Sequence, residues 1–148
     1  MRLAAAAALL SLFSTQALSE TLVTLESKFT VKETLDRLAA ALDQRGIKVA
    51  ARVDHAAGAK AVGLDLPPTE VLMFGNPKLG TPLMQANPAI AIDLPLKVLA
   101  WQDQAGKVWI GYTSPGALKA RHAITGQDET FAAMTGVLQG LAKSASGQ

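Results

Sequence analysis

The stretch Thr69–Leu83, T-E-V-L-M-F-G-N-P-K-L-G-T-P-L, decides how the rest of the chain is organised. An apolar run ends at a glycine, and two prolines interrupt the sequence before apolar residues resume. The pattern predicts a buried strand over Val71–Phe74, a tight loop over Gly75–Gly80 and a short helix that begins at Thr81. We expect the neighbouring elements to hold this loop in place.

The sequence before this stretch predicts two strands with a helix between them. Alternating residues favour strands over Thr21–Phe29 and Ile47–Val53, and the second strand is expected to have one core face and one wet face. Between them, Thr30 and Glu33 form a capping-box pattern that predicts a helix start. Gly46 is a typical C-terminal cap of such a helix.

The sequence after the central stretch predicts a hairpin followed by two helices. Strands over 96–102 and 107–112 flank the turn Asp103–Gly106, which would bring Trp101 and Trp109 together as cross-strand packing. A short helix over Leu118–Ile124 and a last helix over Asp128–Ala145 follow. Residues 144–148 are expected to fray.

The N-terminus has the features of a secretory signal peptide. Arg2 is followed by the apolar run Leu3–Phe13, and cleavage after Ser19 or after Ala17 fits the preference for small residues. We therefore expect residues 1–19 to be removed, leaving a single domain over 20–148 in the periplasm or secreted. No later apolar run reaches 18 residues, so no membrane span is expected in the mature protein.

Composition excludes several classes of site. The 148 residues contain no cysteine, which excludes disulfides, thiolate nucleophiles and zinc–thiolate sites. There are 14 Lys and Arg against 12 Asp and Glu, and they form no basic run, so a nucleic-acid footprint is not expected.

His55 is the first candidate for a functional residue. Asp54 is expected to cap a short helix that runs to about Val62, which places His55 at the first helical position. Backbone amides at a helix N-terminus could hold an anion beside this histidine. The alternative is a surface histidine that bonds a nearby carbonyl group.

The loop Gly75–Gly80 is the second candidate site. Its two glycines, followed by Thr81, have the spacing of a phosphate-binding loop, but the lysine that should follow the second glycine is missing. Pro82 also removes an amide donor. Nucleoside triphosphate binding is therefore not expected. Backbone amides and Lys78 could still hold a small anion or carboxylate, and the alternative is a tight turn without a ligand.

Several motifs also resemble the domain of unknown function 302 family over most of 30–124. They are Asp54-His55-Ala56, Leu66-Pro67-Pro68-Thr69-Glu70, Phe74-Gly75-Asn76-Pro77, Gly80-Thr81-Pro82-Leu83-Met84, Leu94-Pro95-Leu96-Lys97 and Val108-Trp109-Ile110-Gly111-Tyr112. The resemblance implies a compact α+β domain with a curved, mainly antiparallel sheet packed by helices, and a homodimer. It implies no established activity.

Two functions of different class fit these residues. The first is a non-enzymatic binding or interaction module for a small anionic or metal-linked ligand. Its ligand-binding residues would be His55, Glu70, Gly75, Asn76, Lys78, Gly80 and Thr81.

The second function is an enzyme in which His55 acts as general base and Glu70 orients it or acts as acid. The amides of Gly75–Gly80 would hold a developing oxyanion. A metal variant would add Met73 or Met84 as copper(I) ligands, although methionines at such positions are more often core residues. No cofactor is assigned.

Overall fold

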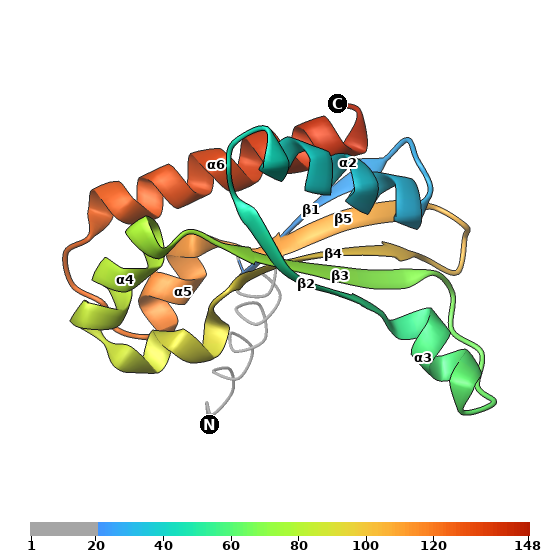
Figure 1. The fold of residues 1–148 in the computed structure, drawn as a ribbon, viewed down its shortest axis with the longest axis horizontal. Coiled ribbons are helices and arrows are strands. Elements are labelled where there is room, and N and C mark those ends of the chain that lie inside the picture. Colours follow the sequence, from blue (N-terminus) through green and yellow to red (C-terminus); the bar gives the residue numbers. More distant parts are fainter. Residues whose placement is uncertain (1–20) are drawn as a thin grey trace, which may run out of the picture.

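The computed structural model describes residues 21–148, so the predicted signal peptide lies outside the described residues. The chain folds into one α+β domain, with a five-stranded sheet and helices (Figure 1). The strands are β1 (Leu22–Ser27), β2 (Lys48–Asp54), β3 (Thr69–Gly75), β4 (Leu96–Gln102) and β5 (Val108–Thr113). The helices are α2 (Val31–Asp43), α3 (His55–Ala61), α4 (Pro77–Ala86), the 3₁₀ helix η1 (Pro88–Asp93), α5 (Pro115–Arg121) and α6 (Asp128–Ser146).

The sheet is antiparallel throughout, with strand order β1-β5-β4-β3-β2. The predicted hairpin forms its centre as β4 and β5, and Trp101 lies opposite Trp109 in the register. This arrangement confirms the expected fold class.

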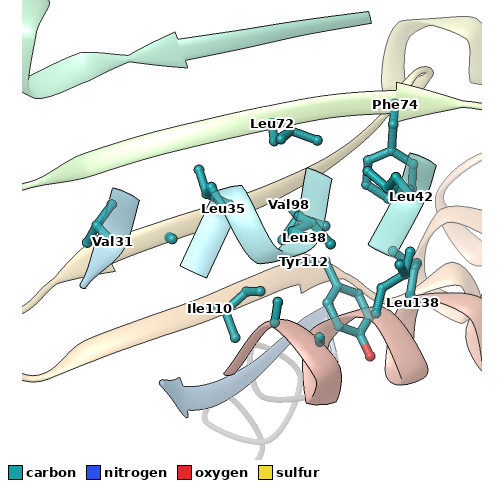
Figure 2. Packing of buried hydrophobic residues seen from close by; sticks show 14 residues of the cluster. Val31, Leu35, Leu38, Leu42, Leu72, Phe74, Val98, Ile110, Tyr112 and Leu138 are labelled. Atoms are coloured by element: carbon teal, nitrogen blue, oxygen red, sulfur yellow. The ribbon is translucent and has the colours of Figure 1, made fainter. Parts of the chain in front are cut away.

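Helices α2 and α6 cover one face of the sheet (Figure 1). Thr30 caps α2, because its hydroxyl group accepts a hydrogen bond from the amide of Glu33 at 3.2 Å. The apolar stripe of α2 packs onto alternate residues of the central strands (Figure 2). This core contains Val31, Leu35, Leu38, Leu42, Leu72, Phe74, Val98, Ile110, Tyr112 and Leu138. We call the side of the sheet that carries it the core face.

A second, smaller core lies beyond one end of the sheet, where α4, η1 and α5 pack against the first half of α6 (Figure 1). Its buried members are Leu83, Ile90, Leu118, Ile124, Phe131 and Met134. Phe131 and Met134 of α6 belong to this core, whereas Leu138 and Leu141, further along the same apolar stripe of the helix, belong to the main core.

The prediction of a loop over Gly75–Gly80 is wrong, because helix α4 begins at Pro77 and includes Gly80 and Thr81. Asn76 is the N-cap, and its side-chain oxygen accepts a hydrogen bond from the amide of Lys78 at 3.0 Å. An asparagine cap followed by proline at the first helical position is a strong start signal. Thr81 is therefore no cap, and it lies in the second turn of the helix.

Two further expectations differ from the structure. Strand β2 has no buried residue, because it is an edge strand whose register shifts between Val49 and Ala51. The C-terminus is held in place, since Ser146 is buried and its carbonyl group accepts a hydrogen bond from the amide of Lys28 at 3.1 Å. Gln148 also donates a side-chain bond to the carbonyl group of Glu26.

Candidate functional site

A groove of about 350 Å³ lies where α2 begins above the ends of the sheet strands. The floor of the groove is the part of the core face that extends beyond the first turn of α2. In this part the side chains of β3 and β4 that face the groove are polar. The lining residues are Thr30, Val31, Lys32, Asp54, Ala56, Pro68, Glu70, Gln102 and Val108. The groove therefore combines apolar walls with two carboxylates and one amine.

Glu70 and Asp54 come together because β2 and β3 are antiparallel neighbours. The two residues are directly opposite in the register, at the end of β2 and near the start of β3. Asp54 also caps α3, since its Oδ1 atom accepts a hydrogen bond from the amide of Ala57 at 2.8 Å. Within residues 21–148, Asp54 forms no ion pair, so it brings an uncompensated negative charge to the groove.

Arg52 holds the wall of the groove together. Its Nε atom donates to Glu70 at 2.8 Å, and its Nη1 atom donates to Asp36 of α2 at 2.6 Å. Its Nη2 atom donates to the carbonyl group of Lys32 at 3.2 Å. One guanidinium group thereby connects strands β2 and β3 to helix α2.

This network shifts the pKa of two of its members. Hydrogen bonds from Lys32 and Arg52 lower the pKa of Asp36 below its usual value. Burial acts to lower the pKa of Arg52, but its bonds to Asp36 and Glu70 outweigh burial and raise that pKa. Both groups therefore stay charged at neutral pH.

His55 and Glu70 both lie at the groove end of the sheet, but in different environments. His55 is exposed at the first position of α3 and does not line the groove, whereas its neighbours Asp54 and Ala56 do. The Glu70 side chain is 13% exposed and paired with Arg52. Glu70 therefore already has a charged partner that the sequence-based hypotheses did not include.

The remaining predicted site residues lie at the opposite end of β3. Gly75 is five residues from Glu70, which is a separation of about 17 Å at about 3.3 Å per residue. Asn76, Lys78, Gly80 and Thr81 follow at the start of α4. The seven predicted residues thus form two groups, and one small ligand cannot contact both.

The metal variant gains no support from the described residues. Residues 21–148 contain no group of three or more His, Cys, Asp or Glu side chains that could hold a metal ion. Met84 packs against the second core, and Met73 lies on β3 near the far end from His55. The thioethers are therefore not gathered around the histidine.

The structure also forms a histidine–carboxylate pair that sequence reasoning missed. The Nε2 atom of His122 lies 2.6 Å from Oδ2 of Asp93, and the histidine side chain is 8% exposed. Arg121 and Asn87 add bonds to Asp93 and to the carbonyl group of His122. The two partners are 29 residues apart, so no local spacing in the sequence could have revealed the pair.

Comparison with known proteins finds related sequences and a solved structure with a similar fold. The chain is 52% identical over 103 residues to the fluoride-specific ion channel FluC 1 of Brucella suis biovar 1 (strain 1330) and to FluC 1 of Brucella abortus biovar 1 (strain 9-941). The match covers 70% of this chain but only 41% and 38% of those proteins, so the chain spans about two-fifths of their length. None of the helices in residues 21–148 has the length and hydropathy that a membrane span requires.

The fold has a solved counterpart in the crystal structure of an uncharacterized conserved protein DUF302 from Bacillus stearothermophilus. That structure superposes with a TM-score of 0.77 at 23% identity and covers 86% of this chain and 99% of that one. The family described as "Domain of unknown function DUF302" matches residues 23–141, which is most of the chain. The chain therefore belongs to the DUF302 family.

Proposed function

We propose that this chain is an exported, non-enzymatic binding module whose small ligand occupies the groove beside Glu70. The observation that carries the proposal is the groove itself, whose volume of about 350 Å³ is that of a small-molecule site and whose lining mixes apolar walls with a few polar groups. Export is proposed from the signal-like sequence of residues 1–19.

The charges of the groove favour a ligand that donates hydrogen bonds. Asp54 is an unpaired carboxylate, while Lys32 is engaged with Asp36 at 2.8 Å. A primary amine on a short apolar body would bond Asp54 and cover Pro68 and Val108. The expectation of an anion depended on free amides at the start of α3 and at 75–80, but the amides of Ala57 and Lys78 are already bonded to Asp54 and Asn76.

A thermal-shift series tests the groove directly. The mature protein, purified from the periplasm, is titrated with ethanolamine and putrescine, and separately with acetate and phosphate. A ligand at about one hundred times its dissociation constant stabilises by about 2.7 kcal/mol, which raises the melting temperature of a domain this size by about 8 °C. Native mass spectrometry of the untreated protein shows any ligand retained from the cell and the site of signal cleavage.

Two charge-removing variants locate the binding. Asp54→Asn keeps the helix cap, because asparagine caps as well as aspartate, and Glu70→Gln keeps the shape of its side chain. Glu129→Gln, which alters an exposed carboxylate at the start of α6, is the matched control. Amine-induced shifts that persist in both groove variants would show that the groove is not the site.

The names of these relatives suggest fluoride as a further ligand to test in the thermal-shift series. Those proteins are fluoride-specific ion channels, and fluoride is a small anion of the class expected from the sequence. A shift produced by sodium fluoride and not by sodium chloride would support an anion-binding module and contradict an amine-binding groove.

The geometry favours the second function, an enzyme that uses His55 and Glu70, less than the binding module. Its oxyanion-binding loop is the first part of helix α4, and this segment lies about 17 Å along β3 from Glu70. A hydrolytic or isomerase activity that is abolished by His55→Ala in a folded protein would nevertheless restore that proposal.

A further inference from the structure

A second cavity, of about 60 Å³, lies at the end of the sheet opposite the groove. The groove is lined by the last residue of β4 and the first residue of β5, whereas this cavity is lined by the start of β4 and the last residue of β5. Figure 1 shows this end of the sheet beside α5 and the groove end beside α3. The lining residues of the cavity are Asp93, Leu96, Lys97, Thr113, Leu118 and Leu138. None of the six lines the groove, so the two sites are separate.

The cavity forms where β4 and β5 separate. The register that joins these strands ends at the pair of Val98 and Tyr112. Beyond this pair, Lys97 is paired with β3 and Thr113 is paired with β1. The cavity therefore opens between two strands that are each held by their outer neighbour.

The cavity has a polar mouth and an apolar floor. Lys97 and Thr113 are exposed, whereas Leu118 is 2% and Leu138 1% exposed. Among the described residues Lys97 has no ion-pair partner, and its Nζ atom donates a long bond of 3.5 Å to the carbonyl group of Pro95. The ammonium group therefore has donors left for a ligand, because it carries three hydrogens.

Asp93 adds a carboxylate that two neighbouring side chains hold in place. Its Oδ2 atom lies 2.6 Å from Nε2 of His122, and its Oδ1 atom accepts a hydrogen bond from Nη1 of Arg121 at 3.3 Å. The Asp93 side chain is 19% exposed, and each carboxylate oxygen can accept a second hydrogen bond. Because the cavity is small, one ligand that fills it contacts both Asp93 and Lys97.

We propose that this cavity binds a short α-amino acid in its zwitterionic form, such as alanine or glycine. The ammonium group of the ligand would bond Asp93, and its carboxylate would bond Lys97 and Thr113 at the mouth. The short side chain would lie on the two leucines of the floor. One water-sized group needs about 10–15 Å³ of such a volume, so the cavity holds about four to six non-hydrogen atoms, which is the size of these two amino acids.

Charge complementarity selects a zwitterion over a simple anion or cation. A carboxylate alone would pair with Lys97 but would lie beside the like charge of Asp93, and an amine alone would meet the opposite conflict. A zwitterion pairs each of its charges with an opposite one. The proposal does not rest on binding in the groove, because the two sites share no residue.

Isothermal titration calorimetry of the purified protein with L-alanine and with glycine tests the site. Acetate and methylammonium each carry only one of the two charges. Each is expected to bind at least about tenfold more weakly than L-alanine, because each lacks one set of charge-assisted hydrogen bonds. Acetate or methylammonium binding as tightly as L-alanine would overturn the proposal, and so would a protein that binds neither amino acid.

Two variants locate the binding. Lys97→Met and Asp93→Asn should each weaken L-alanine binding by at least about tenfold. Lys97 is exposed and its bond to a carbonyl group is long, so Lys97→Met should fold normally and decides the outcome if circular dichroism shows that Asp93→Asn does not. Lys60→Met, at an exposed position of α3 that lines neither site, is the matched control and should bind as the wild type does.

Two results with these variants would contradict the site. Binding of L-alanine that is unchanged in Lys97→Met would overturn the proposal. Binding that is retained in Lys97→Met but lost in Asp54→Asn would place the amino acid in the groove instead, which would overturn this proposal and support the groove as the ligand site.

Discussion

Replacing Arg52 with methionine should loosen the wall of the groove. The variant keeps most of the aliphatic volume of the side chain but removes the donors to Glu70, Asp36 and the carbonyl group of Lys32. Partly exposed ion pairs contribute about 0.2–1 kcal/mol each, and a hydrogen bond contributes about 1 kcal/mol. Arg52 is 29% and Asp36 46% exposed, so we discount the sum for solvent screening and expect a loss of about 1–2 kcal/mol.

Urea unfolding at neutral pH measures this loss, and its pH dependence tests the cause. The pKa of Asp36 is lowered in the folded state, so its ion pairs stabilise fully above the unfolded value near 3.9 and are lost as pH falls through the folded pKa. The difference between wild type and Arg52→Met should therefore shrink in acid. A difference that is the same at pH 7 and pH 3 would refute the ion-pair explanation. A double-mutant cycle of Arg52→Met and Asp36→Asn gives a second test. If the two losses of unfolding free energy simply add, the two side chains do not interact and the ion-pair explanation is refuted.

Three further substitutions test the rest of the fold. Leu38→Ala, at a fully buried position of α2, should cost about 2–5 kcal/mol in urea unfolding. Asp103→Ala should shift tryptophan emission and lower the urea midpoint at pH 7, because the indole of Trp109 donates to Asp103 at 2.9 Å. This effect should fade as pH falls through the pKa of Asp103, which that bond lowers. Gly111→Ala should cost about 1–3 kcal/mol, since its Cβ atom would lie 3.1 Å from Cζ3 of Trp101 and 3.2 Å from a backbone oxygen of β1, and calorimetry measures the loss.

The parts of the fold that could be predicted are those with a strong local signal. Helices α2 and α6 carry apolar stripes over 13 and 19 residues, long enough for the helical period to be unmistakable. The hairpin of β4 and β5 is set by two alternating runs around a short turn that contains Gly106, whose φ of +83° suits glycine. In each case the signal lies within one continuous segment.

The start of α4 could not be settled in the same way, because two adjacent signals compete. Asn76-Pro77 and Thr81-Pro82 both have the pattern of a cap followed by proline. The glycine spacing favoured the later one, but α4 begins at the earlier one, and its buried residue Leu83 packs in the second core. Pro82 is tolerated inside the helix, where it gives up one hydrogen bond.

The partners of the candidate site residues could not be predicted for a related reason. Glu70 was singled out as a polar residue at the end of a strand, but its partners depend on tertiary structure. Arg52 reaches it only because β2 and β3 pair with a register that places Arg52 opposite Leu72 on the core face. The pair His122 and Asp93 likewise depends on how η1 meets α5. Such contacts have no signature in a single sequence.

Strand β3 separates two sides of the sheet through the alternation of its side chains. Glu70 and Leu72 point to the core face, where the groove lies, whereas Val71 and Met73 point to the opposite side. Asp54, which faces Glu70 across the strand pair, lines the groove and also caps α3. A ligand that bonds Asp54 would therefore act on the residue that fixes the start of α3.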